Sequence, residues 1–208
     1  MWGFIGRILI QLKLMFNINF PRKTAAPESS ISIEGKNIKL VVGLGNPGEK
    51  YKDTYHNVGT IFMDSLLKSY NNEVDRDTKW KRVKSFLYAR TNNVILAKSD
   101  TYMNRSGKSV SELLRYFNVK PEEIMIVHDD TDISLGEYKI SYDRGSAGHN
   151  GIESVMKSVK DGGFLRLRIG VRHNDERAGE FVLKHIKSEQ LDSLEQLFNK
   201  IGAVYFKI

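Results

Sequence analysis

Segments with strand-like and helix-like hydrophobic patterns alternate along this chain from about residue 38 to residue 201. The short β-branched run Ile38–Val42 predicts a buried strand, whereas the apolar residues between Val110 and Phe117 recur at the spacing of one helix face. Such alternation is typical of a sheet with helices packed on both of its faces. We therefore predict a single α/β domain built on a mixed, mostly parallel twisted sheet.

The remaining elements are predicted from the same two periodicities. Further strands are expected at Phe86–Ala89, Val94–Ala97, Ile124–Val127, Tyr138–Tyr142 and Leu165–Val171. The first two of these are expected to pair around the polar turn Thr91–Asn93. Helix faces are predicted by apolar residues that begin at Val58, Val110, Ile152 and Leu191.

The first 36 residues differ from this body. Met1–Phe20 is apolar with scattered cations, and Pro21–Ser30 has the composition of a linker. Polar residues interrupt the apolar run before it reaches the roughly 18–20 residues of a membrane span, so no transmembrane segment is expected. A transit peptide, an interfacial helix and an extension without a special role all remain open. We expect residues 1–36 to lie outside the fold and residues 37–208 to form the domain.

Charge and cysteine content narrow the classes of function. The formal net charge is +7, which suits an anionic partner such as nucleic acid, although a solvated basic surface explains the charge equally well. The chain has no cysteine, which excludes a disulfide framework, a thiolate zinc site and a cysteine nucleophile.

The segment Gly43–Gly48 follows a predicted strand and matches the pattern G-x-G-x-x-G, which suggests a dinucleotide site when taken alone. Such a site needs a helix directly after the glycines, because the helix N-terminus binds the pyrophosphate. Here the next residues, Glu49–Asn57, are polar and aperiodic. The acidic residue about 20 positions on, Asp64, lies inside a predicted helix. A tight turn that requires glycine explains the segment better.

Taken as a whole, Val41–Gly59 closely resembles the amino-terminal signature of the bacterial-type peptidyl-tRNA hydrolase family. Four later segments resemble further motifs of that family in the same order, and the match extends over about residues 38–200. These segments are Thr101–Gly107, His128–Asp132, Gly148–Gly151 and Leu167–Gly170.

The resemblance implies an enzyme that hydrolyses the ester between a peptide and the 3′ ribose of tRNA, and so recycles tRNA from prematurely released peptidyl-tRNA. It implies a monomer that binds peptidyl-tRNA rather than DNA and that needs neither a cofactor nor a metal. A cytoplasmic location is expected, with a mitochondrion or plastid as the alternative if residues 1–36 are a transit peptide.

The resemblance assigns catalytic roles to His56, Asp129 and Asn46. An imidazole can accept a proton from water near neutral pH, so His56 would be the base. An isolated histidine in a polar loop is more often a surface residue, so the motif carries this assignment. Asp129 follows the predicted strand Ile124–Val127 and would orient His56 by fixing its tautomer. Asn46 would separate peptidyl from free aminoacyl substrates.

The cluster that contains Asp129, Asp130 and Asp132 also suits a turn or a metal site. No histidine or glutamate accompanies these carboxylates at ligand spacing in the sequence, and the family does not use a metal in its hydrolysis. We therefore expect no metal.

Further residues match the family's substrate-binding positions. Asn104 would hold the peptide backbone, and Asn150 would position water or the developing oxyanion. Tyr51 and Tyr102 would stack on the terminal bases or pack on the peptide, although a core position is an alternative for Tyr102. Arg168 would hold the tRNA 5′ phosphate. Arg144 and Lys139 are weaker candidates for the same basic face.

The sequence departs from the family pattern at three other positions. The family usually has arginine before the catalytic histidine, an apolar residue after the second-motif asparagine, and a lysine that clamps phosphate; here these are Tyr55, Arg105 and Ser141. The departures motivate an alternative from another class, a non-catalytic RNA-binding protein of the kind that supports organellar intron splicing. Retention of His56 and Asp129 favours the enzyme.

Overall fold

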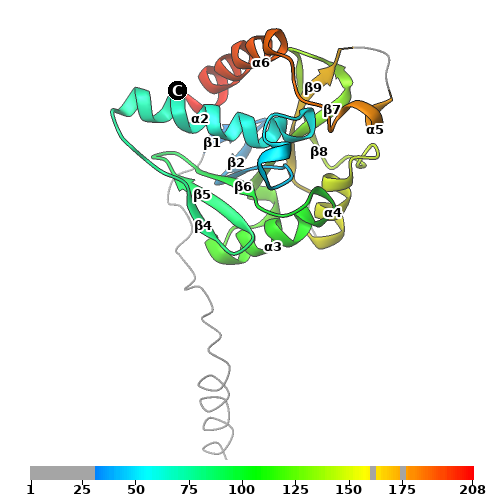
Figure 1. Ribbon diagram of the computed structural model, residues 1–208. Helices are drawn as coiled ribbons and strands as arrows, with labels where there is room; N and C mark the ends of the chain where they lie inside the picture. Colours follow the sequence, from blue (N-terminus) through cyan, green and yellow to red (C-terminus); the bar gives the residue numbers. More distant parts are fainter. Residues whose placement is uncertain (1–30, 160–162, 174–176) are drawn as a thin grey trace, which may run out of the picture.

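A seven-stranded mixed sheet forms the centre of the protein (Figure 1). The computed structural model describes residues 31–159, 163–173 and 177–208. The sheet consists of β3 (Leu40–Gly43), β4 (Lys81–Val83), β5 (Phe86–Arg90), β6 (Ile95–Ser99), β7 (Ile124–Ser134), β8 (Tyr138–Tyr142) and β9 (Leu165–Arg172). Their order across the sheet is β4-β5-β6-β3-β7-β9-β8. The central strands from β6 to β9 run parallel, and the strands at both edges are antiparallel.

Helices cover both faces of this sheet. In Figure 1, α2 (Val58–Val74) and α6 (Ser188–Ile201) lie on the upper face, and α3 (Ser106–Phe117) and α4 (Asn150–Ser158) lie on the lower face. Alternate strand residues serve the two faces: Val41 belongs to the α2/α6 core, whereas Leu40 and Val42 belong to the α3/α4 core. The predicted α/β architecture is confirmed.

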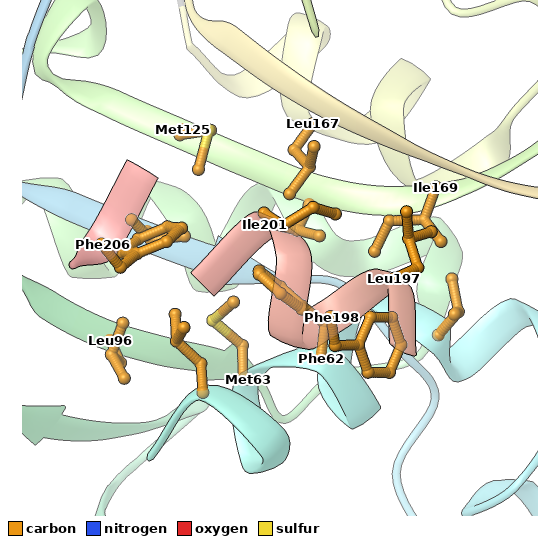
Figure 2. Packing of buried hydrophobic residues seen from close by; sticks show 14 of the residues in the cluster. Phe62, Met63, Leu96, Met125, Leu167, Ile169, Leu197, Phe198, Ile201 and Phe206 are labelled. Carbon is orange, nitrogen blue, oxygen red and sulfur yellow. The ribbon is translucent and has the colours of Figure 1, made fainter. Parts of the chain in front are cut away.

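The α2/α6 core is seen from close by in Figure 2. Phe62 and Phe198 meet edge to face with ring centroids 5.2 Å apart, which joins the two helices. The same cluster includes side chains of the parallel strands, among them Leu96 on β6, Met125 on β7 and Leu167 on β9. Within the described part of the chain, no helix is long and apolar enough to cross a membrane.

The observed start of the fold differs from the expected boundary at residue 37. Residues Ile31–Ile33 (β1) and Lys36–Ile38 (β2) form an antiparallel hairpin, and both isoleucines of β1 are buried in the α2/α6 core. The folded part therefore includes residues 31–36. The predicted strand Ile38–Val42 is in fact divided at Lys39, whose amide donates to Glu123 instead of continuing either strand.

Strand β7 is much longer than the predicted strand Ile124–Val127. It continues to Ser134 because β9 pairs with it beyond the end of β3, in register from Met125 with Leu165 to Asp130 with Gly170. The extension carries aspartates and a threonine, so it lacks the apolar pattern that marks a strand in the sequence. The residues of the third motif, His128–Asp132, consequently lie on a strand and not in a loop.

Two glycines of the first motif allow α2 to approach the sheet. A Cβ atom on Gly43 would overlap the carbonyl of Gly59, and a Cβ atom on Gly59 would overlap the carbonyl of Val127. The segment after Gly48 forms the short turns Glu49–Tyr51 and Tyr55–Asn57, and α2 begins only at Val58. The glycines therefore serve close packing, and no helix opens directly from them as a dinucleotide site requires.

Candidate active site

His56 and Asp129 meet at the carboxyl edge of the parallel strands. His56 lies in the short turn before α2, and Asp129 lies on β7, two residues beyond Val127, the last residue of β7 that pairs with β3. The Nδ1 atom of His56 is 2.9 and 3.0 Å from the two carboxylate oxygens of Asp129. Asp129 is 2% exposed, so its charge is shielded from water. The sequence predicts that Asp129 lies at the end of a strand, whereas in the structure β7 continues beyond it to Ser134.

A second histidine, His149, contacts the same carboxylate. Its Nδ1 atom accepts hydrogen bonds from the backbone amides of Gly151 and Ile152 and caps the N-terminus of α4. Because Nδ1 is the acceptor, the ring proton of neutral His149 lies on Nε2, which donates to Asp129 over 2.9 Å. His149 was missed by the sequence reasoning, although it is the neighbour of Asn150 within the fourth motif.

The electrostatics of the pair favour a charged carboxylate. Burial opposes the charge of Asp129, but His56 and His149 outweigh burial and hold the pKa of Asp129 far below its usual range. Burial also opposes the imidazolium form of His56, yet the charge of Asp129 and its hydrogen bond prevail and raise the pKa of His56. In neutral His56, Nδ1 donates to Asp129, which leaves Nε2 free to accept a proton.

His128 completes a cluster of three histidines around Asp129. It is 2% exposed, and its Nδ1 donates to the backbone carbonyl of Asp129 over 2.6 Å. Burial, together with His149, holds the pKa of His128 well below its ordinary value, so the ring is neutral. Its ring packs edge to face against His149 at 4.7 Å. His128 therefore supports the strand that carries Asp129 without competing for its charge.

Two cavities meet at His56. The first is lined by Asp129, His149 and Asn150 together with the loop at Ser146–Gly148. The second, which we call the amide groove, shares His56, Asn150, Gly179 and Val182 with the first cavity. Its other lining residues are Asn46, Tyr51, Tyr102, Met103, Asn104, Arg105 and Leu183. His56 and all three predicted asparagines thus lie on one continuous hollow.

Asn46 is held rigidly at the base of the amide groove. Its side-chain oxygen accepts a hydrogen bond from the amide of Met103 at 2.8 Å. Its backbone is clasped by Asn57, whose side chain accepts from the Asn46 amide at 2.8 Å and donates to the Asn46 carbonyl at 3.0 Å. The residue after His56 therefore fixes Asn46, a connection that the sequence did not reveal.

The predicted aromatic residues lie at the mouth of the amide groove. Tyr102 is 54% exposed, so the alternative that places it in the core is wrong. The ammonium of Lys50 lies 4.6 Å from the ring centroid of Tyr51. Asn104 and Asn150 are exposed and line the groove. Their amides are therefore open to a ligand.

Arg168 lies beside a separate basic cavity and not in the amide groove. Its Nε donates to Asp130 over 2.7 Å, which neutralises part of its charge. Arg144 and Arg166 line the same cavity. On the neighbouring strand β8, Ser141 pairs with Arg166, and Lys139 pairs with Arg168. Side chains of directly paired residues lie on the same face of a sheet, so Lys139 extends this basic surface.

A distant segment anchors the His56 turn. The His56 amide donates to the carbonyl of Val182 at 2.7 Å, and the Ile186 amide donates to the carbonyl of Asp53 at 2.8 Å. Tyr55 is buried, stacks on His173 with ring centroids 4.8 Å apart, and donates to the side-chain oxygen of Gln190 on α6. The tyrosine that replaces the family's usual arginine is thus a core anchor of this turn.

In the folded protein, two histidines that are distant in the sequence lie next to the carboxylate of Asp129. The nearest nitrogen or oxygen atoms of His56, Asp129 and His149 lie within 4.8 Å of one another. The three residues are therefore close enough to share a metal ion, which the sequence did not indicate. In the described structure both histidines lie within hydrogen-bond distance of Asp129.

A histidine that is oriented by a buried carboxylate and lies beside neutral amides is chemically able to accept a proton from water. Comparison with known proteins identifies the family. Residues 40–206 match the model of the family described as peptidyl-tRNA hydrolase, and the chain belongs to that family and is an enzyme.

Individual relatives agree with this assignment. The chain is 40% identical to the peptidyl-tRNA hydrolase of Sulfurihydrogenibium sp. over 162 residues, which cover 77% of this chain and 85% of that protein. It is likewise 40% identical to that of Nitrosomonas europaea over 161 residues, or 76% and 83% of the two chains. The crystal structure of the Acinetobacter baumannii enzyme matches with a TM-score of 0.69 at 32% identity, covering 78% and 83%.

Proposed function

We propose that this enzyme hydrolyses the ester between peptide and tRNA by a general-base mechanism centred on His56. The Nε2 atom of His56 takes a proton from a water molecule, and the water oxygen attacks the ester carbonyl carbon. The tetrahedral intermediate then breaks its bond to the 3′ oxygen of the ribose, and this oxygen receives the proton from His56. The new carboxyl group of the peptide loses the remaining proton of the attacking water to solvent, and free tRNA and the peptide carboxylate leave the site.

Asp129 serves this cycle in two ways. Its carboxylate keeps the neutral His56 ring in the tautomer with a free Nε2, and it stabilises the imidazolium that forms when water is deprotonated. The Nδ1–carboxylate distances of 2.9 and 3.0 Å support both roles. His149 orients the carboxylate from the other side over 2.9 Å. This shared carboxylate is the observation on which the proposal chiefly rests.

The asparagines supply the positions around the ester. Asn150 stands beside His56 in both cavities and positions water or the developing oxyanion. Asn104 hydrogen bonds to the peptide backbone, as its exposed amide allows. Asn46, which Asn57 and Met103 hold in place, distinguishes peptidyl from free aminoacyl substrates. Preorganised amides suit this role because they need no reorientation when charge develops.

The two ends of the substrate are bound on different surfaces. Tyr51 and Tyr102, at the mouth of the amide groove, pack on the peptide or the terminal bases. Arg168 and its neighbours Lys139 and Arg144 hold the phosphates of the tRNA. The guanidinium of Arg168 remains suited to phosphate because Asp130 engages its Nε atom and fixes its orientation.

The test uses tRNA charged with a labelled, N-blocked amino acid. The wild type should release free tRNA, and His56→Ala should release it at least about a hundredfold more slowly, because the base is lost. Lys68→Ala, an exposed substitution on α2, serves as a control that should retain full activity. Equal release by the wild type and His56→Ala would exclude His56 as the base.

A further inference from the structure

Arg105 places a positive charge in the amide groove, where the family usually has an apolar residue. It is the last residue of the short turn Met103–Arg105 and follows directly after Asn104. Arg105 is exposed, and it lines the same groove as His56 and Tyr102. Its backbone amide donates to the carbonyl of Tyr102 at 2.7 Å, so the turn fixes the origin of the side chain.

The charge of Arg105 is not neutralised inside the groove. Among the described residues, no carboxylate lines this groove and none forms an ion pair with the guanidinium of Arg105. Lys50, whose ammonium lies over the ring of Tyr51, adds a second cation at the groove mouth. A ligand that enters the groove therefore meets an excess of positive charge.

The topology of the sheet indicates which part of the substrate meets Arg105. Arg105 follows β6, whereas the basic cavity with Arg166 and Arg168 lies on β9. Strands β6 and β9 lie on opposite sides of the pair β3–β7 in the sheet. His56 lies at the carboxyl ends of this central pair. An ester bond at His56 with its tRNA directed to the basic cavity sends its peptide toward Arg105.

We propose that Arg105 is a specificity-determining residue that favours peptidyl-tRNAs with acidic side chains near the ester and disfavours those with lysine. The inference rests on the proposed position of the ester at His56. An arginine can pair with a carboxylate through two parallel hydrogen bonds, which an apolar residue at this position cannot provide. The substrate class is therefore narrower than that of a groove with a neutral residue here.

The experiment compares N-acetylated tripeptides esterified to the same tRNA. The ester-linked residue is constant, and the two residues before it are both glutamate, both glutamine or both lysine. For the wild type, kcat/KM should be about two- to tenfold higher with glutamate than with lysine, as expected for partly exposed charge pairs, with the difference mainly in KM. This preference should shrink at about 0.5 M salt.

Three variants decide the cause of the preference. Arg105→Leu should abolish it, and Arg105→Glu should invert it. Arg115→Leu, a matched removal of charge at an exposed position further along α3, should keep it. A wild type that does not discriminate among the peptides, or a preference that survives in Arg105→Leu, would overturn the proposal.

A contact with RNA phosphate gives a different pattern that also overturns it. In that case Arg105→Leu lowers kcat/KM by the same factor for all three peptides. The ratio of Kd values measured with His56→Ala keeps this test separate from the catalytic proposal. If His56 is not the base, His56→Ala cleaves all three peptidyl-tRNAs as fast as the wild type. If the Arg105 proposal is wrong, the Kd values for the glutamate and lysine peptides are equal.

Discussion

At the scale of single residues, hydrogen bonds fix which nitrogen of each histidine in the candidate active site carries the proton. The capping bonds at Nδ1 of His149 place its proton on Nε2, and that proton and the one on His56 Nδ1 both point at Asp129. The carboxylate accepts both, and the remaining nitrogen of His56 is the basic one. The start of α4 thereby determines the tautomer of His149, and the Asp129 carboxylate determines that of His56.

The first prediction is that Asp129→Asn lowers kcat by about 10²- to 10⁴-fold. The asparagine preserves size, but its amide group can donate to Nδ1 of His56 and favours the tautomer with the proton on Nε2. Circular dichroism should show an intact fold. Retention of more than about a tenth of the wild-type kcat would contradict the role of the carboxylate.

The pH profile offers a second prediction. Activity needs neutral His56, and burial lowers its pKa less than Asp129 raises it, so the acidic limb of kcat/KM should lie above the ordinary histidine value of about 6.5. In Asp129→Asn the negative charge that raises the pKa of His56 is gone, whereas the burial that lowers this pKa remains. The limb of the residual activity should then shift to lower pH. A limb that stays in place would assign it to another group.

Site residues that lie within a recognisable motif could be predicted from the sequence, whereas the residues that hold them in place could not. His56, Asn46 and Asn150 stand within segments that resemble known motifs, and all three line one hollow. Gln190 lies outside these motifs, and although Tyr55 lies within the first one, the motif does not predict their contact, which joins positions 135 residues apart. Linear patterns report periodicity and local turns, and they contain no record of which distant side chains meet.

At the scale of elements, the approach of α2 to β3 and β7 depends on the absence of side chains at Gly43 and Gly59. We predict that Gly59→Ala lowers the free energy of unfolding by about 1–3 kcal/mol, because the added methyl group displaces α2 from the Val127 carbonyl. Gly145→Ala, where an added Cβ meets nothing within 4 Å, should change stability by less than about 0.5 kcal/mol. Chemical denaturation measures both; equal effects would refute the close-packing argument.

The cap of α4 can be separated from the contact with Asp129. His149→Ala should lose about 0.5–2 kcal/mol of stability, because the amides of Gly151 and Ile152 lose their acceptor. His149→Asn should retain most of that stability, since asparagine is a favourable cap. In both variants kcat should fall, because neither side chain provides the Nε2 donor. Full activity of His149→Asn would show that the cap alone matters.

Helices and strands whose apolar residues recur at regular spacing were predicted well. Strands that are held only by hydrogen bonds to a neighbouring strand were not. The helix face that ends at Phe117 lies on α3 as expected, and Asn118 ends the helix in the left-handed conformation with φ of 52°. The short strand β4 is mostly exposed and is held by its pairing with β5. The polar half of β7 exists because β9 lies beside it. Such strands depend on the neighbouring strands with which they pair, so no local sequence pattern predicts them.

At the scale of the whole molecule, Lys139, Arg144 and Arg168 lie on the surface to which the proposal assigns the tRNA phosphates. Removal of Lys139 and Arg144 by a double alanine substitution should weaken tRNA binding and reduce the slope of log Kd against log salt by about 0.7–0.9 for each phosphate that these side chains neutralise. The pair Lys68→Ala and Arg115→Ala removes the same charge types elsewhere on the surface. Filter binding over a salt series measures the slopes. Identical slopes for the two double variants would show that only net charge matters.

The bonds between the His56 turn and Val182–Ile186 have a consequence for synthesis of the protein itself. During translation this chain is itself a peptidyl-tRNA, the class of molecule on which its family acts. The His56 turn cannot gain its contacts with Val182, Ile186 and Gln190 until those residues have left the ribosome. The site can therefore form only after residues 182–190 have been synthesised, so the order of residues along the chain delays its formation.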